Sequence, residues 1–143
     1  MFVWNLHLSC ANYRSVVPAG ETEWTVSGRC TGNTADIPLT ARGEAQVRAT
    51  AELVVGEGKL IDPARVAKVV CSPRSRARRT LELLLGDEAA VAAADKVVYT
   101  EDIREWDYGV YEGLLPGEIA EARRGSGKTG KWDIWTEGAE GGE

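Results

Sequence analysis

A Ser-Pro pair at positions 72–73, followed by four arginines, is the part of the sequence best suited to bind an anion. The pair follows a β-rich run, and Ser before Pro is typical of a helix start. A helix start presents free backbone N–H groups and a positive dipole end, so arginines there are unfavourable unless an anion is present. Arg76 is predicted to bind a phosphate with two parallel hydrogen bonds, and the alternative is a solvated basic face. The four are Arg74, Arg76, Arg78 and Arg79.

A second candidate is the segment 104–113, which places acidic residues among tryptophan and tyrosine. A carboxyl group desolvated by aromatic neighbours has a raised pKa and can act as a general acid. Taken alone, the segment fits an aromatic-rich turn with surface acids better.

Two further features are rejected as sites. Gly125–Thr129 is similar to a nucleotide-binding P-loop, but Ala122 stands where that motif needs glycine, and a helix is expected before the loop instead of after it. His7 is the only histidine of the chain, which excludes a mechanism that needs two imidazoles from these residues. We interpret His7 as structural or exposed.

Composition indicates one globular domain, because 143 residues with 43% hydrophobic and 27% charged side chains can build a single core. The net charge of −5 argues against nucleic acid as a partner. We expect no membrane partner and no signal peptide, because no apolar run approaches the ~18–20 residues of a membrane span and the first residues lack a basic leader. Cys10, Cys30 and Cys71 have no metal-ligand spacing, so we expect reduced thiols and a cytoplasmic protein.

The elements that must position these residues alternate between helix and strand. Residues 1–19 show no settled periodicity, although Phe2, Trp4, Leu6 and Leu8 alternate as a strand face would, and 20–39 reads as a long loop. Strands are expected at 65–71 and 96–100. Helices are expected at 40–55, with Ala45, Ala49 and Leu53 toward the core, at 72–85 and at 115–124. The order predicts an α/β domain with a parallel sheet.

Five motifs in order resemble the histidine phosphatase (phosphoglycerate mutase-like) superfamily. They are Gly20–Thr25, Ser27–Gly32, Asp36–Gly43, Ser72–Thr80 and Arg104–Gly113. The ending, Trp132–Glu143, is similar to the sedoheptulose-1,7-bisphosphatase branch. The resemblance implies a three-layer α/β/α fold with a mostly parallel sheet, incomplete at the C-terminus. It also implies hydrolysis of a sugar phosphate, such as sedoheptulose 1,7-bisphosphate, through a phosphohistidine, with no cofactor and no metal.

The same resemblance assigns roles to individual residues. Arg76 corresponds to a phosphate-binding arginine and Glu105 to the proton donor. Thr31 and Gly32 correspond to loop contacts with the substrate, and Tyr108 to the residue beside the acid.

The sequence departs from the family at the nucleophile. Pro18-Ala19-Gly20 stands where the family has Arg-His-Gly, so Ala19 occupies the nucleophile position, and the second family histidine would lie beyond Glu143. We therefore expect an atypical segment 1–19 and a partial domain 20–143, without phosphatase activity. We expect poor order in 1–19 and after Gly125, and self-association through an uncovered sheet. The alternatives are a phosphate-binding pseudoenzyme and a phosphoglycerate mutase-type transferase.

Overall fold

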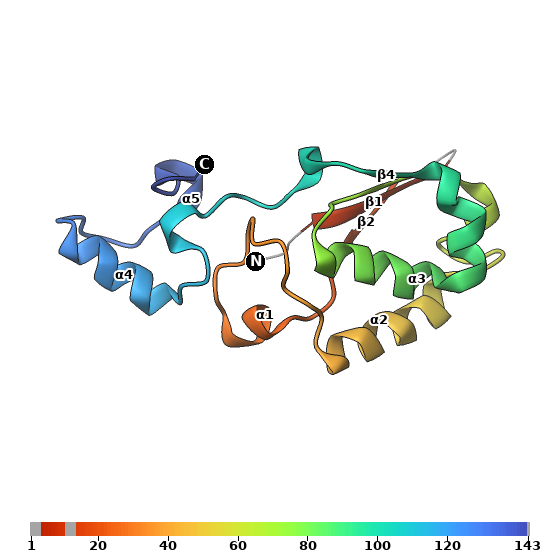
Figure 1. The fold of residues 1–143 in the computed structure, drawn as a ribbon, viewed down its shortest axis with the longest axis horizontal. Coiled ribbons are helices and arrows are strands. Elements are labelled where there is room, and N and C mark those ends of the chain that lie inside the picture. The colour runs from red at the N-terminus through yellow and green to blue at the C-terminus, as the bar shows by residue number, and fades with distance from the viewer. Residues whose placement is uncertain (1–3, 11–13, 143) are drawn as a thin grey trace. The chain divides into compact units, whose positions relative to one another are not determined.

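The computed structural model describes residues 4–10 and 14–142, and these form two compact units (Figure 1). The first unit comprises the chain up to Thr22 together with Ala35–Arg104. The second unit comprises Glu23–Thr34 together with the chain from Glu105 onward.

The first unit contains a four-stranded sheet in the order β2-β1-β3-β4. Its strands are β1 (Trp4–Cys10), β2 (Arg14–Pro18), β3 (Val66–Cys71) and β4 (Val97–Tyr99). β1 is antiparallel to both neighbours, and only β3 and β4 are parallel. The α/β class is confirmed, but the expectation of a mostly parallel sheet is wrong. Only residues 11–13 join β1 to β2, and a parallel pair needs a crossover of about a dozen residues or more.

The N-terminal segment is an integral part of this sheet. β1 lies between β2 and β3, with Leu6 opposite Cys71 and Leu8 opposite Val69. Leu6 and Leu8 are each 1% exposed. The expected disorder of residues 1–19 is therefore wrong for 4–10 and 14–18. Alternation explains the fixed register, because a slip by one residue would turn both leucines away from the core.

Helix α2 (Ala41–Val54) begins where the sequence predicts, with the Thr40 hydroxyl accepting from Gly43 N at 2.9 Å. Its buried face is different from the predicted one, because Gly43 and Val47 are buried while Leu53 is 78% exposed. Ala45 and Ala49 are exposed as well. The helix packs through Gly43 against the backbone of Glu21, so closely that a Cβ at this position would collide with the Glu21 carbonyl oxygen.

Helix α3 (Ser75–Ala93) follows β3 and packs against α2. It begins three residues later than predicted, and Gly86 interrupts it with φ of 69° and ψ of 176°. Ala77, Leu81 and Leu84 are buried as predicted.

Both helices cover the sheet face that carries Leu6 and Leu8 (Figure 1). The opposite face carries His7, Lys68 and Val70, beside Ile103 of the 3-10 helix η3 (Glu101–Ile103). The described residues of the first unit therefore form one sheet layer and one helix layer. Two further 3-10 helices, η1 (Pro63–Arg65) and η2 (Ala94–Lys96), lead into β3 and β4.

The second unit is built from short helices around an aromatic core. The helices are α1 (Glu23–Ser27), η4 (Gly109–Tyr111), α4 (Pro116–Gly125) and α5 (Ile134–Glu137). The core contains Tyr108, Tyr111, Ile119 and Ile134, and the Trp132 ring packs edge-on against Tyr111 at 5.0 Å between centroids. The chain after Gly125 is thus partly ordered by α5 and Trp132, contrary to expectation.

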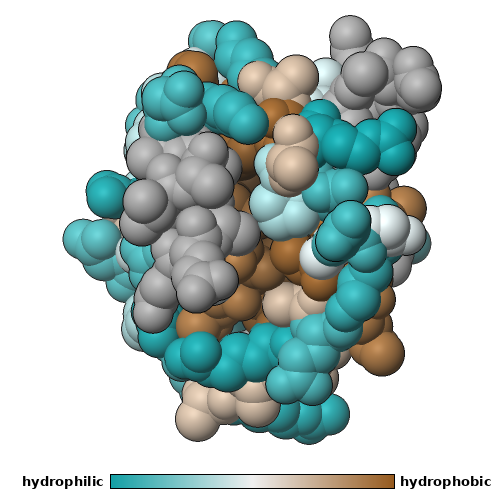
Figure 2. Space-filling view, turned by 90° about the vertical axis from the view of Figure 1, so that its right-hand side faces the viewer, coloured by the Kyte–Doolittle hydropathy of each residue, from teal (hydrophilic) through white to brown (hydrophobic). Residues whose placement is uncertain are grey.

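Apolar surface remains exposed on the first unit. Leu53 near the end of α2 and Leu60 in the following turn are 78% and 60% exposed. Figure 2 shows apolar surface in the middle of one face, inside a hydrophilic border.

Among the residues that the structure describes, no helix combines the length and the apolar character that a membrane span requires.

Replacing Leu8 by alanine tests whether β1 is a structural strand. We expect Leu8→Ala to lower the free energy of unfolding by about 2–5 kcal/mol, because it leaves a cavity between the sheet and the helices that cover it. The measurement is urea denaturation followed by circular dichroism. Ser9→Ala, on the half-exposed opposite face, is the matched control and should change stability little. Equal stability of Leu8→Ala and the wild type would show that β1 does not belong to the folded core.

Candidate functional site

The residues predicted to form the site fall on both units. The first unit holds Ala19 and Arg76, and the second unit holds Thr31, Gly32, Glu105 and Tyr108.

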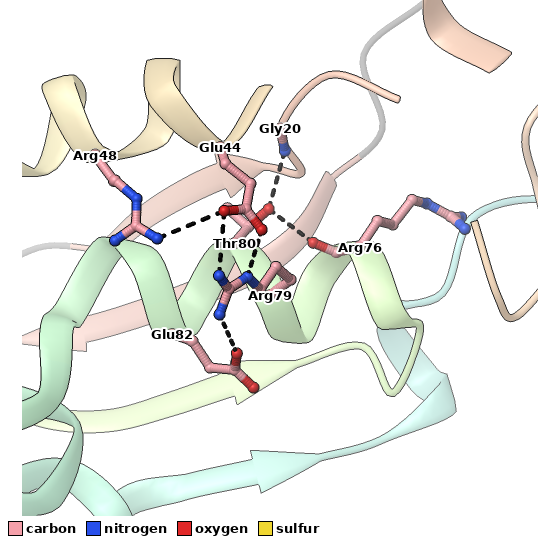
Figure 3. Close-up of polar contacts among 7 residues, drawn as sticks. All are labelled: Gly20, Glu44, Arg48, Arg76, Arg79, Thr80 and Glu82. Carbon is pink, nitrogen blue, oxygen red and sulfur yellow. Dashed lines mark hydrogen bonds and ion pairs between the residues drawn. The ribbon is translucent and has the colours of Figure 1, made fainter. Parts of the chain in front are cut away.

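In the first unit, the chain after β2 is fixed to the beginning of α3 (Figure 3). Gly20 N donates to the Thr80 hydroxyl at 2.9 Å, and this hydroxyl donates to the Arg76 carbonyl oxygen at 2.7 Å. Thr80 is 1% exposed, so both bonds form away from water. Ala19, directly before Gly20, is therefore held beside the helix that carries Arg76.

The other arginines of this helix start have partners within the first unit. Arg74 makes two parallel hydrogen bonds to the Glu101 carboxylate, at 3.1 and 3.0 Å. The Arg78 guanidinium lies over the Tyr99 ring, 5.0 Å from its centroid. Arg74 and Arg78 thus make specific contacts, which the alternative of a solvated basic face does not include.

Arg79 forms the centre of an ion-pair network between α2 and α3 (Figure 3). Its Nε donates to Glu44 at 2.7 Å and its Nη1 to Glu82 at 3.2 Å, while Arg48 pairs with Glu44 at 3.5 Å. The hydrogen bond from Arg79 is the main cause of a lowered pKa at Glu44. Because these side chains reach the surface, solvent screens the network and its contribution to stability is small.

Arg76 differs from its neighbours because it is only 1% exposed. Figure 3 shows its guanidinium pointing away from the Arg79 network. A buried guanidinium needs oxygen acceptors around it, and phosphate oxygens match its planar geometry.

In the second unit, the Glu112 carboxylate accepts hydrogen bonds from residues 32–34, which follow and include the predicted substrate contact Gly32. Its carboxylate accepts from Gly32 N at 3.2 Å, Asn33 N at 2.6 Å and the Thr34 hydroxyl at 3.1 Å. It also accepts from Tyr108 N at 3.3 Å. Sequence reasoning assigned no role to Glu112. The only available signal was its place within the aromatic, acidic segment 104–113.

Thr31 and Gly32 are both buried in this unit. The Thr31 hydroxyl donates to the Arg29 carbonyl oxygen at 3.2 Å. Gly32 is packed so tightly that a Cβ would collide with the Trp106 carbonyl oxygen, Glu112 and the Tyr108 ring. The loop therefore has one well-defined backbone path.

Tyr108 lies in the core of the second unit at 1% exposure, with its ring edge-on to Trp132 at 6.2 Å. Burial raises the pKa of its phenol, and the negative charge of Glu105 raises it further. Glu105 is half-buried, and its charge acts on the Tyr108 phenol. Both predicted residues belong to the second unit.

Cys71 is the last residue of β3, and a thiol between a strand and a helix start is a site where nucleophilic cysteines occur. Here the side chain is fully buried and its Sγ donates to the Ser72 carbonyl oxygen at 3.3 Å. Burial raises the pKa of the thiol to about 12, although the Arg78 charge acts in the opposite direction. Cys71 is therefore a packed structural thiol.

Comparison with known proteins connects these residues to one family. Residues 16–143 match the family model of the histidine phosphatase superfamily (branch 1). Over 133 residues the chain is 44% identical to sedoheptulose 1,7-bisphosphatase of Saccharomyces cerevisiae, covering 90% of this chain and 48% of that protein. It is 40% identical over 124 residues to an acid phosphatase of Mycobacterium tuberculosis, covering 87% of this chain and 51% of that protein.

A solved structure supports the same relationship. The structure of an open reading frame product from Mycobacterium tuberculosis aligns with a TM-score of 0.57 and 31% identity, covering 87% of this chain and 54% of that chain. The chain thus spans about half the length of the curated relatives it matches.

The raised pKa of Cys71 predicts its reactivity. At pH 8 the thiolate fraction of a group with a pKa near 12 is about 1 in 10,000. We therefore expect iodoacetamide at pH 8 to leave Cys71 unmodified in the folded protein and to alkylate it after denaturation. Mass spectrometry of the peptides gives the result, and the denatured sample is the control. Alkylation of folded Cys71 at the rate of a free thiol would contradict this assignment.

Proposed function

The chain belongs to the histidine phosphatase superfamily (branch 1), and from that premise we propose that it binds a sugar phosphate without forming a phosphohistidine. A substrate similar to sedoheptulose 1,7-bisphosphate is favoured by the 44% identity to the yeast enzyme of that name. Arg76 binds the phosphate, Thr31 and Gly32 contact the sugar phosphate, and Tyr108 lies beside Glu105, as their motifs imply.

The observation that carries the proposal is Ala19. The chain at this point is tied through Gly20 and Thr80 to the helix of Arg76, which supports the proposal that Ala19 occupies the nucleophile position. A methyl group has no lone pair with which to attack phosphorus. Glu105 could then protonate no leaving group, because no bond to phosphorus is broken.

His7 does not replace the missing nucleophile. It lies opposite Val16 in the β1–β2 pair, three residues before Ala19. Three residues of extended strand correspond to about 10 Å, which is well beyond the ~3 Å that an attacking nitrogen and a phosphorus require. His7 is therefore too far from the proposed site to accept the phosphoryl group.

The start of α3 supplies the phosphate-binding chemistry. Its dipole favours an anion, and Arg76 can add two charge-assisted hydrogen bonds. Arg76 is assigned to the ligand because its motif corresponds to the phosphate-binding arginine and because its side chain is buried at the start of the helix.

Other properties of the protein are proposed on simpler grounds. We propose the cytoplasm as its location, because Cys30 and Cys71 are free thiols, which persist in a reducing compartment. Nucleic acids and membranes are not proposed as partners, since the net charge is −5. Self-association through the β4 edge, where Val98 and Tyr99 are exposed, is proposed as well.

Phosphate binding is tested by substitution of Arg76. We expect Arg76→Ala to weaken the binding of inorganic phosphate at least tenfold, because a charge-assisted bidentate contact is lost. Isothermal titration calorimetry at two salt concentrations measures it, with weaker binding at high salt. Arg78→Ala on the same helix is the matched control and should bind like the wild type. Unchanged phosphate affinity in Arg76→Ala would rule out this site.

Absence of the covalent step is tested with labelled substrate. We expect no acid-labile phosphate on the protein after incubation with sedoheptulose 1,7-bisphosphate or with phosphoglycerates, and no release of inorganic phosphate. The double variant Pro18→Arg, Ala19→His is the comparison, and it should acquire acid-labile phosphate if Ala19 marks the nucleophile position. Labelling of the wild-type protein would contradict the proposed function, and labelling of the double variant at position 19 would support the register.

A further inference from the structure

We propose that Glu112 is a positioning residue that fixes the substrate loop, residues 31–34, in its ligand-binding shape. The inference rests on the proposed function, because that function assigns ligand contacts to Thr31 and Gly32. It adds a residue that binds no ligand itself and acts through the backbone of the loop.

The geometry shows one carboxylate serving two segments of the second unit. Oε2 accepts from Gly32 N and from the Thr34 hydroxyl, and Oε1 accepts from Asn33 N. Oε1 also accepts from Tyr108 N, on the segment that begins with Glu105. A single side chain therefore joins the substrate loop to the segment of the predicted acid.

The chemistry of this cluster requires a charged carboxylate. All four groups around Glu112 donate, and a carboxylate offers about four lone-pair positions on two oxygens. Glutamine would keep one accepting oxygen, but its amide N–H₂ would point at groups that also donate. Aspartate would hold the charge about one methylene too far from the loop.

Neighbouring contacts keep the loop in reach of Glu112. Cys30 N donates to the Leu114 carbonyl oxygen at 3.0 Å, and Gly113 N donates to the Cys30 carbonyl oxygen at 2.9 Å. Asn33 Nδ2 donates to Asp107 at 3.1 Å on the same segment. These bonds hold residues 30–33 beside residues 107–114. The Glu112 carboxylate therefore lies within hydrogen-bond distance of the Gly32 and Asn33 amides.

Gly32 makes the arrangement specific. Its Cα lies against Glu112, the Tyr108 ring and the Trp106 carbonyl oxygen, with no room for a side chain. The loop is thus pre-organised, and pre-organisation reduces the entropic cost of binding a ligand. Loss of Glu112 should weaken the contacts made by the loop and leave phosphate binding at Arg76 unchanged.

The first measurement is amide hydrogen exchange by NMR spectroscopy. In Glu112→Gln we expect the amides of Gly32 and Asn33 to exchange about 10- to 100-fold faster, because each loses a charge-assisted hydrogen bond. The amide of Val69, in β3, should be unaffected. Glu121→Gln, an exposed glutamate on α4, is the matched control for loss of one charge. Unchanged exchange at Gly32 and Asn33 would overturn the proposal.

The second measurement separates the loop from the phosphate site. We expect Glu112→Gln to bind sedoheptulose 1,7-bisphosphate about tenfold more weakly than the wild type, with the same affinity for inorganic phosphate. If both affinities fall equally, Glu112 supports the fold in general and the proposal is wrong. If the wild type does not bind the bisphosphate, the proposed function fails and the ligand role of Glu112 fails with it, whereas hydrogen exchange still decides whether Glu112 holds the loop.

A milder variant covers the case in which Glu112→Gln does not fold. Thr34→Val removes one of the four donors and retains the carboxylate. We expect the bisphosphate affinity to fall about 2- to 10-fold while the thermal midpoint remains near that of the wild type. Wild-type affinity in this variant would contradict the proposal.

Discussion

The buried hydroxyl of Thr80 is the contact on which the first unit's candidate site depends. It accepts a hydrogen bond from Gly20 N and donates its own proton to the Arg76 carbonyl oxygen. Gly20 and Thr80 lie 60 positions apart in the chain. Thr80 therefore links the chain after β2 directly to the beginning of α3.

In the second unit as well, a distant polar side chain binds the amide of a glycine. There a glycine amide, Gly32 N, is bound by the Glu112 carboxylate, as Gly20 N is bound by Thr80. Both glycines lie in crowded surroundings, since a Cβ at Gly20 would come within 2.9 Å of Val47 and one at Gly32 would collide with backbone. In each unit, a loop is held by a polar side chain from a distant part of the sequence.

Local signals in the sequence predict where helices and strands begin and end. They predict less well which face of an element is buried. The Thr40 cap and the strand ending at Cys71 were correct because capping and β-propensity act over a few residues. The buried face of α2 was predicted wrongly because two stripes of small apolar residues have the same spacing. The approach of Gly43 to Glu21 selects between them, and this is a tertiary contact.

The role of β1 and of Glu112 could not be read from the sequence for related reasons. β1 is a central strand because it pairs with both β2 and β3, and its alternation is too short to reveal either partner. Glu112 accepts from two amides and one hydroxyl that lie 78–80 residues earlier in the chain, and no spacing rule connects them.

The most direct test of the account is ³¹P NMR spectroscopy of the protein with sedoheptulose 1,7-bisphosphate. The account predicts broadened or shifted substrate signals with no inorganic phosphate and no phosphohistidine signal, whereas growth of either of those two signals would contradict it.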